Sequence, residues 1–143
     1  MIDHKTAPYA ALLLRVSLGV MFIAHSLCLK VFVFTVPGTV QFFASLGLPA
    51  AAAYATIAAE ILGGLALILG VQTRVAALAL VPVLAGALWV HAGNGWVFSA
   101  QGGGWEYPLF LIVAALVQAL VGDGAFALRK SPSLDRLKPA PAR

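Results

Sequence analysis

The sequence predicts an all-α, polytopic membrane protein: a bundle of four transmembrane helices with a short interfacial segment between helices 1 and 2. Two observations support this fold class. Of the 143 residues, 62% are hydrophobic and only 10% are charged, whereas about a quarter of the residues are charged in a soluble domain. The apolar residues also gather in long stretches, which are separated by glycine, proline or charged residues. Lipid covering most of the surface explains both features.

One of these stretches, residues 50–70, has a single charged side chain, Glu60, at its midpoint. As an α-helix it is roughly 31 Å long, about the thickness of the hydrocarbon core of a bilayer. A lone carboxylate at this depth costs about 2.5–3.5 kcal/mol on the lower of the available scales. We therefore expect the other spans to supply Glu60 with a partner, or Glu60 to be protonated.

The remaining elements follow from length and punctuation along the chain. The predicted division is a polar cytoplasmic lead, a four-helix transmembrane domain and a basic, partly disordered cytoplasmic tail, at residues 1–8, 9–122 and 123–143. The predicted spans are residues 9–29, 50–70, 75–90 and 106–121. Within the first connection, residues 30–49, we expect a short amphipathic segment at the membrane interface, because Pro37-Gly38 and Pro49 interrupt it.

The basic residues predict the orientation of the bundle. Four spans place both termini on one side, and most of the basic residues are expected there: Lys5, Arg15, Arg74, Arg129, Lys130, Arg136, Lys138 and Arg143. Lys30 is expected on the opposite side. By the positive-inside rule both termini face the cytoplasm. The net charge of +4 is thereby explained by orientation in the lipid bilayer, and nucleic acid is not an expected partner.

Arg15 is the predicted partner of Glu60. It lies four residues to the cytoplasmic side of the centre of its span, or roughly 6 Å below it. We therefore expect a structural intramembrane pair between Arg15 and Glu60, in which the guanidinium and the carboxylate remove each other's burial cost. In the alternative, Arg15 extends to the cytoplasmic headgroups and Glu60 stays protonated.

A second group of polar residues is expected at the outer ends of the spans. His25, His91 and Glu106 would converge at the mouth of a pocket whose floor is Glu60, with Trp105 beside them. Such a set combines proton donors and acceptors with flat aromatic surfaces, and it suits a lipid-soluble, carbonyl-bearing molecule such as a quinone. In the alternative, these histidines and tryptophans are ordinary anchors at the membrane surface.

The sequence contains no self-sufficient catalytic motif. Cys28 is the single cysteine, which excludes a dithiol relay and a thiolate metal cage. The histidines lack the short spacing of a metal site, so no metal is predicted. Whether the chain is an enzyme therefore stays open, and a quinone is the one candidate cofactor.

Several short motifs resemble the DoxX family of small four-helix membrane proteins. They occur in family order over roughly residues 10–122: Arg15-x-x-Leu18-Gly19, Phe22-x-Ala24-His25, Gly38-Thr39, Phe42-Phe43, Leu46-Gly47-Leu48-Pro49, Glu60-x-x-Gly63-Gly64, Thr73-Arg74, His91-x-x-Asn94-Gly95 and Gly102-Gly103-Gly104-Trp105-Glu106-Tyr107-Pro108. The sequence departs from the family at Ser26, where many relatives have glycine, and at Leu27-Cys28-Leu29, where a glutamine is frequent.

The resemblance implies a multi-pass protein of the bacterial cytoplasmic (inner) membrane in a redox setting, since the family is named after a subunit of a thiosulfate:quinone oxidoreductase. We therefore expect a subunit or partner of a quinone-linked, oxidative-stress or sulfur-oxidation system, with other membrane or redox proteins, or a second copy of the chain, as partners. The alternatives are a non-catalytic assembly or stability factor and, less favoured, a small transporter.

Overall fold

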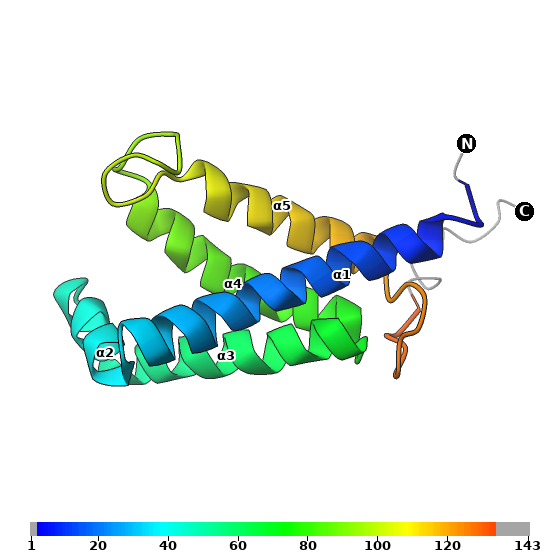
Figure 1. Cartoon of the computed structure of the whole chain (residues 1–143), viewed down its shortest axis with the longest axis horizontal. Coiled ribbons are helices and arrows are strands. Elements are labelled where there is room, and N and C mark those ends of the chain that lie inside the picture. The colour runs from blue at the N-terminus through cyan, green and yellow to red at the C-terminus, as the bar shows by residue number, and fades with distance from the viewer. Residues whose placement is uncertain (1–2, 134–143) are drawn as a thin grey trace, which may run out of the picture.

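A computed structural model describes residues 3–133, and in this range the chain is helical, with one isolated β-bridge between Val71 and Arg129. Figure 1 shows long helices side by side, with a short helix at one end of the bundle. The six elements are five α-helices and one π-helix, η1: α1 (Ala7–Ile23), η1 (Ala24–Val33), α2 (Val36–Ser45), α3 (Ala50–Leu69), α4 (Thr73–His91) and α5 (Glu106–Val121).

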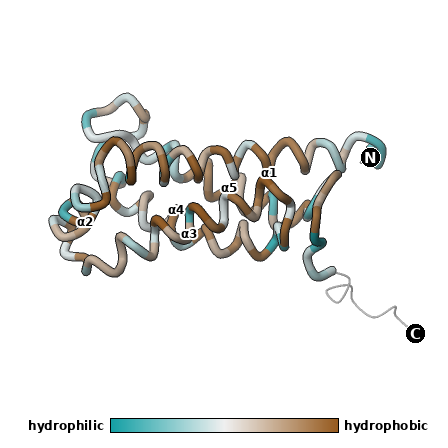
Figure 2. Tube along the Cα trace, turned by 60° about the horizontal axis from the view of Figure 1, so that its bottom comes forward, coloured by the Kyte–Doolittle hydropathy of each residue, from teal (hydrophilic) through white to brown (hydrophobic). Residues whose placement is uncertain are grey.

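Three of these helices are long and apolar enough to cross a membrane: α1 continued by η1, α3 and α4. Helix α5 is also apolar but has only 16 residues. Large apolar side chains such as Leu13, Phe110 and Leu120 point outward and are exposed, and Figure 2 shows hydrophobic residues along all the long helices. The protein is thus a helical membrane bundle, and the predicted fold class is confirmed.

The first span runs further than the sequence predicts. Instead of ending at residue 29, it continues to Val33 as the π-helix η1, whose hydrogen bonds join residues five apart. Lys30 is therefore part of a helix and not of the connection that was expected to begin there. The expected short segment follows as α2, which is capped by the Thr35 side chain accepting from the Gly38 N–H at 3.3 Å.

Helix α1 packs on α3, α3 on α4, and α4 on α5. Glycines bring α1 and α3 close together, because a Cβ added at Gly19 would lie 2.7 Å from the Gly64 carbonyl oxygen, and one added at Gly64 would lie 3.0 Å from that of Gly19. The small residues on the Glu60 side of α3 thus allow the backbone of α1 to approach closely, as is common at packed membrane-helix interfaces. The core of the bundle is formed mostly by Leu18, Phe22, Leu67, Leu80, Leu84, Leu111 and Ala115.

Residues 123–131, which we call the capping segment, fold back over the end of the bundle where α1 begins. Their N–H groups donate to carbonyls of other elements: Ala125 to Pro8, Leu128 to Leu69 and Arg129 to Gly70. This part of the predicted tail is therefore docked on the bundle, whereas residues 134–143 of that tail lie outside the described range. Helix α2 and the loop between α4 and α5 lie at the other end (Figure 1).

Candidate functional site

Glu60 is paired with Lys30. The Lys30 Nζ lies 2.9 Å from Oε1 and 2.8 Å from Oε2 of Glu60, so the ammonium donates to both carboxylate oxygens. The carboxylate side chain is 7% exposed and that of the lysine 20%. Two side-chain contacts fix η1 against its neighbours, with the Ser26 hydroxyl donating to the Ile57 carbonyl and the Thr39 hydroxyl donating to the Lys30 carbonyl. Glu60 is thus stabilised by Lys30, a residue that was expected to lie in the connection after the first span.

The expected pair between Arg15 and Glu60 is wrong. Arg15 is 1% exposed, and its Nη2 donates to the Ala125 carbonyl of the capping segment at 2.8 Å. The guanidinium lies against Gly70, where an added Cβ would overlap it, and the acidic charge that acts on it is that of Asp123. Arg15 therefore joins α1 to the capping segment, far along α3 from Glu60.

The direction of helical side chains explains both results. In a helix the Cα–Cβ bond points toward the N-terminus, and long side chains extend that way. Arg15 lies in the N-terminal half of the first span, so it reaches toward the capping segment and away from the centre. Lys30 lies near the other end of the same span, so its side chain reaches back toward the centre, where Glu60 lies. If only the depth of the Cα atoms along the helix axis is considered, Arg15 is favoured as the partner of Glu60.

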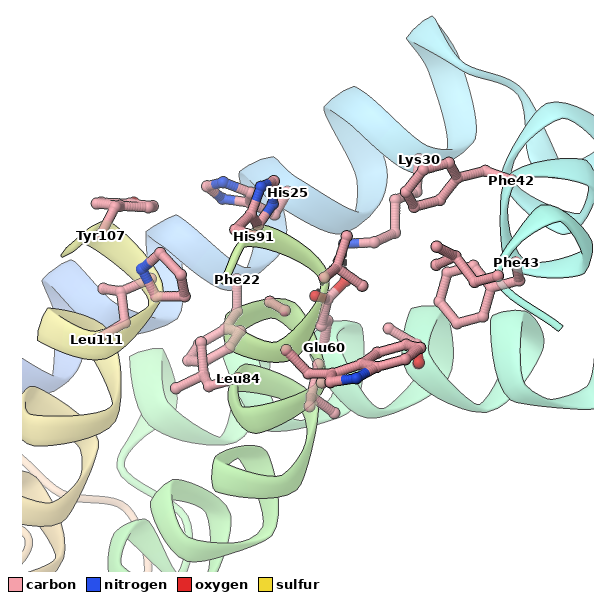
Figure 3. A pocket seen from close by; sticks show the side chains of 18 of the residues that line it. Phe22, His25, Lys30, Phe42, Phe43, Glu60, Leu84, His91, Tyr107 and Leu111 are labelled. Carbon is pink, nitrogen blue, oxygen red and sulfur yellow. Dashed lines mark hydrogen bonds and ion pairs between the residues drawn. The ribbon is translucent and has the colours of Figure 1, made fainter. Parts of the chain in front are cut away.

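A cavity of about 240 Å³ opens beside the Lys30–Glu60 pair. A cavity of about 150 Å³ is enough to hold benzene, so this one has room for a substituted aromatic ring. Its walls are mainly apolar and come from α2 and from the half of the bundle that lies away from the capping segment: Phe22, Phe42, Phe43, Val83, Leu84, Trp89, Tyr107 and Leu111. Figure 3 shows the Lys30–Glu60 pair together with His25 and His91 around this space.

His25 projects from η1 into the cavity wall. Its Nδ1 lies 2.9 Å from the Met21 carbonyl oxygen, one helical turn earlier. The ring stacks on Tyr107 of α5, with 5.9 Å between the ring centroids and 26° between the planes. The Tyr107 hydroxyl in turn donates to the Met21 sulfur at 3.3 Å. These contacts fix the orientation of the imidazole on the apolar side of the cavity.

His91 is the last residue of α4 and also lines the cavity. Its Nδ1 lies 2.9 Å and 3.1 Å from the carbonyl oxygens of Gly102 and Gly103. Both glycines have positive φ values, 83° and 79°, a conformation that favours glycine. The glycine run in the loop between α4 and α5 is therefore needed to present two carbonyls to this one imidazole.

The structure places the other two candidate residues outside this cavity. The Glu106 Oε1 accepts from the Phe98 N–H at 2.8 Å, which fastens the loop between α4 and α5 to the start of α5. Trp105 packs edge-on against Trp96, with the ring centroids 4.4 Å apart. Three of the five predicted site residues, His25, Glu60 and His91, thus share the cavity, and Tyr107 takes the position that was expected for Trp105.

Sequence reasoning missed Lys30 and Tyr107 as site residues. Tyr107 is half-buried, and its neighbour Pro108 is the first buried residue of α5. Lys30 could have been found by its side-chain direction, as described above. Among residues 3–133, no group of three or more His, Cys, Asp or Glu side chains is placed to hold a metal ion.

Comparison with known proteins identifies the family of the chain. The DoxX family model matches residues 10–93, more than half of the sequence. A protein of Bacillus subtilis (strain 168) named "Putative oxidoreductase CatD" is 31% identical over 125 residues, which cover 87% of this chain and 88% of that protein. No solved structure matches the chain. This chain belongs to the DoxX family.

Proposed function

We propose that this protein is a quinone-binding subunit or partner of a membrane redox system in the bacterial inner membrane, with both termini in the cytoplasm. One observation carries the proposal: the cavity combines aromatic and aliphatic walls with two imidazoles and an ion pair, within a bundle built for lipid surroundings. Mostly apolar pockets with a few polar groups are typical of small-molecule sites. The oxidoreductase name of the Bacillus subtilis relative supports the redox setting.

The chemistry of the site suits a ligand that exchanges protons as well as electrons. Histidine is the side chain whose charge changes most readily near neutral pH, and it serves as a general acid or base when it lies within hydrogen-bond distance of the ligand. His25 and His91 both line the cavity, close to an ion pair that holds a positive and a negative charge in place. We assign proton exchange with the bound quinone to these two residues.

The test uses a variant that fills the cavity. Gly86 lines it, and a Cβ added there would meet no atom within 4 Å, so Gly86→Leu should be accepted without a clash. We expect the quinone that copurifies with the protein, measured by chromatography of its lipid extract, to fall several-fold. Gly93→Leu is the matched control, because Gly93 also has open space around its added Cβ but does not line the cavity. Equal quinone content in both variants and the wild type would overturn the proposal.

A non-catalytic assembly factor is the second candidate, and the hydrogen bonds of His91 and Glu106 favour it, because both residues fasten the loop between α4 and α5. In that case Glu60→Gln lowers the amount of protein in the membrane, since it weakens the pair with Lys30. Gly86→Leu would then leave both the protein amount and the activity of the associated redox system unchanged. Gly86→Leu therefore separates the two candidates, because only the quinone-binding function predicts an effect of filling the cavity.

A further inference from the structure

We propose that the cavity selects the reduced, hydroxyl-bearing form of its ligand, a hydroquinone, over the oxidised quinone. This inference rests on the proposed quinone-binding function and adds the redox state that is bound. The groups that make the selection are the Nε2 atoms of His25 and His91, which act as acceptors for ligand hydroxyls.

The backbone fixes the tautomer of both imidazoles. Nδ1 of His25 faces the Met21 carbonyl at 2.9 Å, and Nδ1 of His91 faces the carbonyls of Gly102 and Gly103 at 2.9 Å and 3.1 Å. A carbonyl oxygen can only accept, so the hydrogen must be on Nδ1 in both rings. In a neutral imidazole with its hydrogen on Nδ1, the Nε2 atom carries a lone pair and accepts a hydrogen bond.

Neither of these Nε2 atoms has a hydrogen-bond partner within residues 3–133, although both rings line the cavity. In Figure 3 the two imidazole rings lie between Tyr107 and the Lys30–Glu60 pair. The surrounding wall is mostly apolar, and the hydroxyl of Tyr107, the ring that stacks on His25, already donates to Met21. The cavity therefore presents two acceptors that a bound ligand can satisfy.

The Lys30–Glu60 pair does not reverse this preference. Both carboxylate oxygens of Glu60 already accept from Lys30, and the ammonium keeps one of its three hydrogens for a ligand oxygen. A quinone carries only acceptor oxygens, so one of its carbonyls can accept a hydrogen bond from Lys30. Its other carbonyl and the Nε2 atoms of both histidines are then left without donors. A hydroquinone supplies hydroxyl donors to the histidines and still offers oxygen lone pairs to Lys30.

The test compares duroquinol with duroquinone, which share one carbon skeleton and differ in their two oxygens. Binding to the purified full-length chain in detergent is measured by calorimetry under argon at about pH 8, where an imidazole is ordinarily neutral. We expect duroquinol to bind about tenfold more tightly, because buried polar groups left unpaired are costly. Equal binding, or tighter binding of duroquinone, would overturn the redox preference and leave the proposed function standing. Binding of neither compound would overturn both.

Two further measurements locate the preference. The dimethyl ether of duroquinol has the same ring but only acceptor oxygens, so it should bind as weakly as duroquinone. In the double variant His25→Gln/His91→Gln the amides offer donors as well as acceptors, and the ratio of the two affinities should fall toward one. His4→Gln, outside the cavity, should keep the wild-type ratio. An ether that binds as tightly as duroquinol, or an unchanged ratio in the double variant, would contradict the inference.

Discussion

At the scale of single residues, the account depends on which cation neutralises Glu60. A carboxylate in the apolar interior of a membrane bundle needs a partner. In this structure the partner is Lys30, whose Nζ lies 2.8 Å from the Glu60 Oε2. The pair also sets the polarity of the cavity, because it is the charged part of a mostly apolar wall. The stability of the bundle and the chemistry of the site therefore share this contact.

Replacing Lys30 should test this contact through stability. Lys30→Met leaves Glu60 without its cation, and removing one member of a buried pair typically costs about 3–5 kcal/mol. We expect a loss of this order in the free energy of unfolding, measured by SDS titration in mixed micelles. The charge-swapped variant Lys30→Glu/Glu60→Lys should recover much of the loss. Lys130→Met, at an exposed position, serves as the control, and a Lys30→Met protein as stable as this control would contradict the assignment.

At the scale of elements, Asp123 connects the capping segment to the start of α4. Its Oδ1 accepts from the Thr73 N–H at 3.2 Å and from the Ser131 hydroxyl at 2.6 Å, while its Oδ2 accepts from the Ser131 N–H. It thus acts as an N-cap supplied from a distant part of the chain, since Gln72 makes no side-chain cap. Burial alone would raise the pKa of Asp123, but the hydrogen bonds from Ser131 and Thr73 together lower it below its usual value.

This lowered pKa predicts a specific dependence of stability on pH. The unfolded chain binds a proton at Asp123 more readily than the folded one, so the contribution of Asp123 is fully present above its ordinary pKa of about 3.9 and is lost as the pH falls through the lower, folded value. Asp123→Asn should lack this part of the acid destabilisation, and Ser131→Ala should show less of it. Thermal unfolding followed by circular dichroism between about pH 6 and pH 3 measures the effect. An identical pH profile for Asp123→Asn and the wild type would contradict the cap.

The helices themselves could be predicted from the sequence, but the local geometry that builds the site could not. Long apolar stretches that end at glycine or proline identified the spans, because a helix must be apolar and long enough to cross the hydrocarbon core of a bilayer. The π-helix η1 has no comparable pattern in composition, and it extends the first span far enough to include Lys30. His25, Glu60 and His91 could be predicted as site residues, because polar side chains in apolar spans have a high free-energy cost of burial. Their hydrogen-bond partners are mostly backbone carbonyls, which no side-chain pattern indicates.

At the scale of the whole molecule, the arrangement of basic residues predicts how the protein lies in the membrane. Arg15, Arg74 and Arg129 gather at the end of the bundle where the capping segment lies, whereas Lys30 lies toward the other end. On the basis of the positive-inside rule we propose that both termini face the cytoplasm. In this orientation the cavity lies in the outer half of the membrane.

Reporter fusions test this orientation. Alkaline phosphatase is active only after export, so fusions at either terminus should be inactive, whereas green fluorescent protein at the same positions should fluoresce. Alkaline phosphatase inserted after Gly93, in the loop between α4 and α5, should be active and serves as the matched control. Active phosphatase at either terminus would contradict the proposed orientation.

The most direct test of the central claim is where a photoreactive quinone attaches to the protein. An azidoquinone irradiated with the full chain in membranes, followed by mass spectrometry of the peptides, reports the residues around the bound ring. We expect adducts on the cavity wall, at residues 21–30 and 83–91, and excess duroquinol should suppress them. Adducts confined to outward-facing positions such as Leu13 and Leu120, unaffected by the competitor, would contradict the account.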